Sequence, residues 1–219
     1  MSKVIYENHL SSKEDIKDFI LEGKAKISFP EGAMRLENEL SEKEGQKANF
    51  VLWCPIAFPS DVRIDWEFRP VKEPGLAMMF FSAKARNGGS IFDEGLTPRT
   101  GIYNQYHSGE INAFHVSYFR RKEPDERAFH SCNLRKSYGF HLVAQGADPI
   151  PDADENAQWY KISVIKKAEH VSFLINDLRI FDFEDDGISY GDLLTGGCIG
   201  FRQLAPMIGE YRNLKVMWI

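Results

Sequence analysis

The amino-acid sequence predicts an all-β protein, a sandwich or barrel of antiparallel strands. Short segments rich in β-branched and aromatic residues recur at short intervals, divided by Gly, Pro, Asn and Asp. Residues 62–69 alternate strictly between apolar and charged side chains, which is typical of a strand with one buried face. Helix signals are confined to one stretch near the N-terminus. Together these observations favour an all-β fold over mixed classes.

The exception is residues 11–23, where we expect one short helix. Ser12 can cap its start, with Asp15 three residues later. Apolar side chains follow at helical spacing, and Gly23 can end the helix.

The remaining elements read as strands. The sequence Asn176-Asp177 is a hairpin turn signal between two of them. The apolar C-terminal segment is expected to pair inside a sheet rather than hang free. The expected strands are residues 62–69, 75–83, 159–167, 170–175, 178–185, 196–204 and 211–219.

We expect residues 1–219 to form a single domain. A chain of this length with 43% hydrophobic residues can bury one substantial core. No internal repeat or low-complexity linker divides it. The longest irregular stretches are residues 84–100 and 146–158, and long loops on a β scaffold are often functional.

Composition restricts the partners. A net charge of -5 gives no general reason to expect nucleic acid or an anionic membrane as a partner. The N-terminus lacks the apolar core of a secretory signal, and no apolar run approaches the ~20 residues needed to span a bilayer. The three cysteines have no metal-like spacing. We therefore expect a cytoplasmic protein with reduced thiols and without a cofactor or metal.

Potentially chemical side chains concentrate between positions 103 and 141, where four of the six histidines lie. Read as strands, this region places Gln105 and His107 on one face, and likewise His115 and Ser117. Tyr118 has the parity of the core face and reaches a cleft only if a bulge redirects it. One open surface lined by these side chains is the resulting hypothesis.

Such a surface suits an acidic sugar. Histidines can transfer protons near neutral pH, and arginines bind carboxylates through a planar fork. These are the groups needed to remove a proton beside a uronate carboxylate and eliminate across the ring. They are equally the groups needed only to bind the sugar. Ordinary ion pairing of the arginines with residues 123–126 is the simpler alternative.

Two other acidic patterns are weaker candidates. Asp65 and Glu67 share a strand face in the manner of glycosidase acids. Arg63 and Arg69 lie on that face too, so a solvated ladder of alternating charges is the favoured interpretation. The stretch "PDADEN" begins like a calcium loop, but Ala157 stands where that loop needs glycine.

Three stretches carry a resemblance: "GIYNQYHSGEINAFHVSYFRR", "CNLRKSYGFHLVAQGADPIP" and "GGCIGFRQLAPMIGEYRNLKV". They resemble the YesU-like bacterial family of unknown function, and the last also resembles the final strands of concanavalin A-like lectins and glucanases. The resemblance implies a jelly-roll sandwich of two antiparallel sheets with a concave, carbohydrate-receiving face. It also implies an association with bacterial pectin (rhamnogalacturonan) utilisation. It transfers no catalytic residue.

The resulting hypothesis is an intracellular carbohydrate-active protein that binds and processes short uronate-containing oligosaccharides, by a lyase or hydrolase type of reaction. The candidate catalytic residues are His107, His115 and Tyr118. The candidate substrate-binding residues are Tyr103, Gln105, Tyr106, Ser117, Arg120, Arg121, Asn133, Arg135 and His141.

Two alternatives stay open. The first is a non-catalytic, lectin-like protein with the same cleft. The second is a structural or partner-binding role, as a homodimer through a sheet face.

Overall fold

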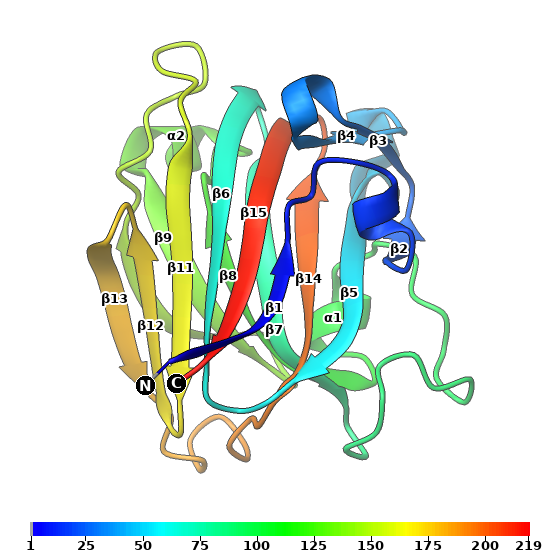
Figure 1. Cartoon of the computed structure of the whole chain (residues 1–219), viewed down its shortest axis with the longest axis vertical. Coiled ribbons are helices and arrows are strands. Elements are labelled where there is room, and N and C mark those ends of the chain that lie inside the picture. The colour runs from blue at the N-terminus through cyan, green and yellow to red at the C-terminus, as the bar shows by residue number, and fades with distance from the viewer. Residues whose placement is uncertain (1) are drawn as a thin grey trace.

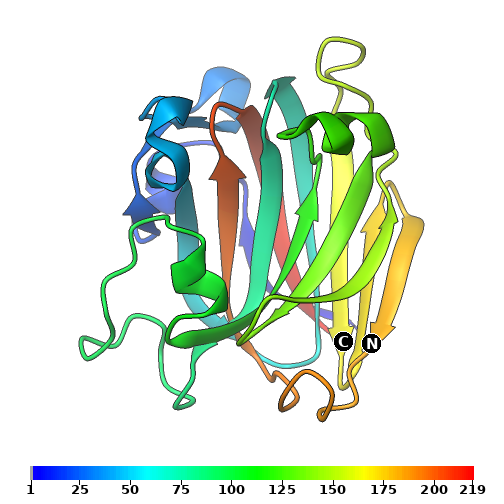
Figure 2. The same cartoon turned by 180° about the vertical axis from the view of Figure 1, so that it is seen from behind.

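The computed structural model describes residues 2–219 as two antiparallel sheets packed face to face (Figures 1 and 2). The eight-stranded sheet A runs in the order β13-β12-β11-β6-β15-β4-β3, and β1 also pairs with β15. The seven-stranded sheet B runs in the order β10-β9-β8-β7-β14-β5-β2. The predicted all-β sandwich of two antiparallel sheets is confirmed.

The elements have the following bounds. Sheet A comprises β1 (Lys3–Asn8), β3 (Ala25–Ser28), β4 (Met34–Asn38), β6 (Val62–Lys72), β11 (Tyr160–Lys167), β12 (His170–Ile175), β13 (Leu178–Glu184) and β15 (Ile208–Trp218). Sheet B comprises β2 (Ile20–Gly23), β5 (Phe50–Phe58), β7 (Leu76–Ala85), β8 (Ile111–Tyr118), β9 (Ser131–Ser137), β10 (His141–Ala147) and β14 (Gly197–Leu204). The helical elements are α1 (Asn104–His107), α2 (Pro124–Phe129) and the 3₁₀ turns η1 (Glu14–Ile16), η2 (Pro30–Gly32) and η3 (Glu42–Ala48).

The main core lies between the sheets, and β6 shows how the sequence builds it. Its apolar residues, Trp66 and Phe68 among them, are buried in alternation with half-buried charged residues. On the outside Arg63 pairs with Asp65 at 2.8 Å, and Arg212 from β15 reaches Glu67. These pairs match the charge ladder favoured from the sequence and leave no unpaired acid couple for glycosidase chemistry.

The chain ends and the predicted hairpin also agree with the sequence. Asn176 and Asp177 adopt the positive φ values of a tight turn between β12 and β13. Lys3 pairs with Trp218, so the two termini lie side by side at one end of sheet A (Figure 1). Within residues 2–219, no helix has the length and apolarity needed to cross a bilayer.

The N-terminal helix is shorter than predicted. Asp15 and Ser12 do form the expected reciprocal cap, with the Asp15 carboxylate accepting the Ser12 backbone N–H at 3.1 Å. The helix ends after the single 3₁₀ turn η1. The reason is that Ile20–Gly23 becomes the edge strand β2 and pairs with β5.

The interpretation of the region from Tyr103 to His107 as a strand is also wrong, because Asn104–His107 forms α1. Tyr103, Tyr106 and His107 stand at helical spacing, and Tyr106 is fully buried. The segment lies on the outside of sheet B instead of inside it, so its backbone makes local turns.

A second, smaller core covers part of the outer face of sheet B, the face turned away from sheet A. Trp53, Phe80 and Tyr106 are its centre, with ring centroids 5.4–6.4 Å apart. It holds α1 and the long segment between β7 and β8 over the β5 side of the sheet (Figure 2). This layer determines which part of the outer face is reachable from solvent.

Gly101 fixes the entry to α1. Its φ is +90°, and an added Cβ would lie 1.9 Å from the Asn49 carbonyl oxygen. Its N–H donates to the Tyr106 hydroxyl, and its carbonyl accepts from Arg202.

Gly101→Ala is therefore expected to cost about 1–2 kcal/mol for the backbone conformation and a further ~1–3 kcal/mol for the overlap. Gly88→Ala is the matched control, since Gly88 has φ +86° and nothing within 4 Å of the added Cβ. Urea unfolding measures both. Equal losses of stability in the two variants would contradict the close approach at Gly101.

Candidate functional site

A tyrosine–histidine pair lies at the border between the covered and open parts of the outer face of sheet B. The Tyr103 hydroxyl is 2.7 Å from Nε2 of His115. His115 is on β8, and its side chain is only 1% exposed, beneath Tyr103. The other ring nitrogen, Nδ1, has no hydrogen-bond partner within residues 2–219. Any ligand on this face would therefore meet Tyr103 first.

Arg202 lies under the same tyrosine. Its guanidinium is 4.9 Å from the Tyr103 ring and 5.2 Å from the Tyr106 ring, and the side chain is fully buried. Its Nη1 donates to the Gly101 carbonyl at 2.8 Å. In the described chain it has no carboxylate within 4.0 Å, and its Nε is unpaired. A buried cation without a counter-charge is costly, so Arg202 makes this surface attractive to anions.

Arg135 is the more accessible cation beside the pair. It is the cross-strand partner of His115 on β9, so both side chains lie on the outer face. Its guanidinium is 3.7 Å from the ring centroid of Phe140 and donates to the Phe140 carbonyl. Phe140 is 48% exposed and also packs against Tyr103 and His107. Arg135 and Phe140 thus offer a cation next to accessible apolar surface.

Amide and hydroxyl groups follow Arg135 along the strands, where Ser117 and Asn133 are buried and Gln145 is exposed. Ser117 on β8 pairs with Asn133 on β9, and the Asn133 amide contacts Gln145 at 2.7 Å. Nη1 of Arg120 lies 3.0 Å from the same amide and donates to Ser131. Arg120 also forms an ion pair with Glu126 at 2.5 Å, so its charge is compensated.

Burial dominates the proton affinities of this cluster. It raises the pKa of Tyr103 to about 12, although Arg202, Arg135 and Arg120 act in the opposite direction. It lowers the pKa of His115 well below the ordinary value, aided by Arg135, and also lowers that of His107. Both members of the pair are therefore neutral at pH 7, because burial outweighs the opposing effect of the three arginines on the Tyr103 pKa.

Tyr118 does not belong to this surface. It is fully buried between the sheets, where its hydroxyl accepts a hydrogen bond from Trp66 Nε1 at 2.9 Å. Burial raises its pKa well above the ordinary value. No bulge redirects the side chain, so strand parity decides its position, and its assignment as a catalytic residue is not supported.

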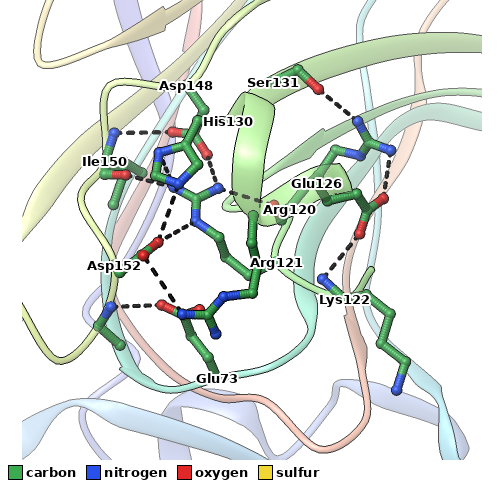
Figure 3. Close-up of polar contacts among 12 residues, drawn as sticks. Glu73, Arg120, Arg121, Lys122, Glu126, His130, Ser131, Asp148, Ile150 and Asp152 are labelled. Atoms are coloured by element: carbon green, nitrogen blue, oxygen red, sulfur yellow. Dashed lines mark hydrogen bonds and ion pairs between the residues drawn. The ribbon is translucent and has the colours of Figure 1, made fainter. Parts of the chain in front are cut away.

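Arg121 is likewise structural (Figure 3). Its fully buried guanidinium contacts Asp148 at 3.2 Å and Asp152 at 2.8 Å, and donates to the Ile150 carbonyl. Nδ1 of His130 lies 3.1 Å from Nη2. These contacts tie the end of β8 to α2 and to the segment after β10, so Arg121 cannot receive a substrate carboxylate.

Of the remaining predicted residues, Gln105, Tyr106 and His141 lie away from this cluster, and His107 lies beside Tyr103. Gln105 accepts from the Thr100 backbone N–H and stabilises the loop before α1. Tyr106 lies in the second core. His107 is half-buried beside Tyr103 and within 2.7 Å of Ser108. His141 lines a separate pocket next to Tyr190. The structure thus brings together Tyr103, His107, His115, Ser117, Arg120, Asn133 and Arg135.

One acidic cluster has the spacing of a metal site. Oxygen atoms of Glu73, Asp152 and Asp154 lie within 4.8 Å of one another. Arg127 pairs with Glu73 at 2.7 Å, and Arg121 with Asp152. These ion pairs already compensate the two less exposed carboxylates, so the cluster gives no support for a cation.

Comparison with known proteins shows to which family the chain belongs. The model of the family described as "Domain of unknown function (DUF1961)" matches residues 3–216. The chain belongs to this family. It is 49% identical over 212 residues to "Uncharacterized protein YesU" of Bacillus subtilis (strain 168), covering 97% of this chain and 94% of that protein. The predicted family is confirmed.

Solved structures show the same fold. A Bacillus subtilis protein described as having unknown function and a galectin-like fold is 48% identical, with a TM-score of 0.94 over 98% of this chain and 95% of that one. The Emp47p carbohydrate recognition domain is 13% identical, with a TM-score of 0.62 over 99% and 97% of the two chains. At that identity the second likeness concerns the fold alone.

Sequence reasoning missed Arg202 and Phe140. Arg202 follows the core residue Phe201, so strand parity could have placed it on the outer face with His115. What parity could not show is that α1 folds over it. Phe140 lies in a turn, where no periodicity marks an apolar residue as a contact surface.

Replacing Arg121 with Met should lower the free energy of unfolding by about 3–5 kcal/mol, because Asp148 would stay buried without its cation. Arg135→Met, the matched control, should cost less than about 1 kcal/mol, since Arg135 has no carboxylate partner. Urea unfolding measures the free energy of unfolding of both variants. Comparable losses would contradict the division into a structural and a surface arginine.

His115 should make the protein less stable in mild acid. Its pKa is near 6.5 unfolded and lower when folded, so below pH 6.5 the unfolded state binds more protons. Between pH 6.5 and the lower pKa of the folded state, the free energy of unfolding should fall by up to ~1.4 kcal/mol for each unit by which the pH is lowered. His115→Gln should flatten the profile between pH 7 and 5.5 in denaturant titrations. An unchanged slope would show that His115 is not buried in its neutral form.

Proposed function

We propose that the protein binds short acidic oligosaccharides on the outer face of sheet B, with a uronate carboxylate against Arg135. The observation that carries the proposal is the pair of uncompensated guanidiniums around Tyr103. Within residues 2–219, every arginine except Arg86, Arg135 and Arg202 has a carboxylate within 4.0 Å. An anionic ligand would supply the missing charge.

The neighbouring groups suit a sugar. The exposed amide of Gln145 can exchange hydrogen bonds with ring hydroxyls, and it contacts Asn133, which is buried and lies two residues from Arg135 along β9. Phe140 offers apolar surface to a ring. The carbohydrate recognition domain of similar fold supports this choice of ligand class.

We take galacturonate-containing, pectin-derived oligosaccharides in the cytoplasm as the ligand. The acidic preference rests on Arg135, with Arg202 acting through its field from beneath Tyr103, because its own side chain is fully buried.

A second candidate function is β-elimination, favoured by the 2.7 Å contact between Tyr103 and His115. In that reaction the Tyr103 oxygen takes the proton on C5 of the uronate as its own hydroxyl proton passes to Nε2 of His115, the C4–O glycosidic bond breaks, and a C4=C5 double bond forms. The leaving oxygen takes a proton. Tyr103 is the group that can touch the sugar, with Arg135 neutralising the carboxylate. His115 is only 1% exposed and would act through Tyr103.

Calorimetric titration with trigalacturonate tests the binding proposal. Arg135→Gln should weaken binding at least about tenfold, because a charge-assisted hydrogen bond is lost. Higher salt should weaken wild-type binding. Arg179→Gln, an exposed arginine of sheet A, is the matched control. Equal affinities of Arg135→Gln and wild type would refute the proposal.

Ultraviolet absorbance of the unsaturated uronate separates elimination from binding alone. If Tyr103 transfers the proton, Tyr103→Phe should keep trigalacturonate affinity within a few-fold and abolish the absorbance gain. Wild-type binding without any absorbance gain or change in product mass would leave the lectin-like function.

A further inference from the structure

A cavity, which we call the end pocket, opens at the end of the sandwich near the β9–β10 turn. Its volume is about 400 Å³, within the range of small-molecule sites. Asn112, Lys136 and Ser137 contribute from the strands, and the loop of residues 185–194 closes one side.

An ion pair between β9 and the loop of residues 185–194 fixes the shape of the pocket. Lys136, 1% exposed, donates through Nζ to Asp185 at 2.8 Å and to the Gly191 carbonyl at 2.7 Å. These bonds fix the closing loop to β9. Tyr190 of that loop packs against His141 with ring centroids 5.3 Å apart. The walls are therefore formed without a ligand.

Two buried polar atoms of the lining lack partners. Ser137 is 1% exposed, and neither its Oγ nor Oδ1 of Asn112 has a hydrogen-bond partner within residues 2–219. A buried polar group without a partner costs free energy, so unpaired atoms in a pocket wall indicate places where a ligand hydroxyl would bind.

Arg86 supplies the charge. Its guanidinium lies 4.0 Å from the ring centroid of Tyr138, and it has no carboxylate within 4.0 Å in the described chain. Stacking on the ring leaves the N–H edge of the guanidinium available, and this edge fits a carboxylate. Tyr138 and Tyr190 add aromatic surface of the kind that sugars pack against.

We propose that the end pocket is a separate binding site for a sugar acid of one or two residues. The carboxylate pairs with Arg86, and hydroxyls bond to Ser137 and Asn112. The site uses neither Arg135 nor Tyr103. This proposal can therefore be tested independently of the outer-face proposal.

Titration of the whole protein with D-galacturonate and with D-glucuronate tests it, with D-galactose as the neutral control. At least one acid should bind, and D-galactose should bind at least about tenfold more weakly. Arg86→Gln should weaken binding of the sugar acid at least about tenfold. The variant should fold normally, since Arg86 is exposed. Arg135→Gln should leave this affinity unchanged.

Ser137→Ala is the second variant. It removes an unpaired buried hydroxyl, so stability should be kept or raised while affinity for the acid falls several-fold. No binding of either acid at tens of millimolar would overturn the proposal. So would equal binding of D-galactose, or an acid affinity that is unaffected by Arg86→Gln or is lost in Arg135→Gln instead.

Discussion

The contact of Tyr106 with Trp53 and Phe80 is the interaction on which the candidate site depends. It converts the outer face of a seven-stranded sheet into a covered half and an open half. Covering brings Tyr103 down onto His115 and encloses Arg202. Without α1 in this position, Arg202 would be an ordinary solvated surface arginine.

The outer faces of the two sheets differ in whether their arginines are paired with carboxylates. On sheet A, arginines such as Arg63 and Arg212 are paired with carboxylates across and along the strands. On sheet B, Arg135 and Arg202 have no carboxylate within 4.0 Å in the described chain, and Arg202 is fully buried while Arg135 is partly exposed. Burial holds Tyr103 and His115 neutral, so positive charge dominates this surface, and a bound anion would be the natural counter-charge.

The sandwich could be predicted because its strands follow period 2, as β6 does, and because Asn176-Asp177 marks a hairpin. Parity also placed Tyr118 toward the core and His115 outside. The site was only partly predictable. Tyr103 and His107 fit both a strand and a helical face, and only the packing of Tyr106 decides between these. Arg121 and Arg120 are adjacent in sequence, yet one is locked to Asp148 and the other reaches the surface, and nothing local signals that difference.

The measurement that tests the central claim most directly is a crystal structure of the protein with bound trigalacturonate. The account predicts a uronate carboxylate about 3 Å from the Arg135 guanidinium, with the sugar beside Phe140 and within reach of the Tyr103 hydroxyl. A saccharide seated on sheet A, or an outer face of sheet B left empty at saturating ligand, would contradict it.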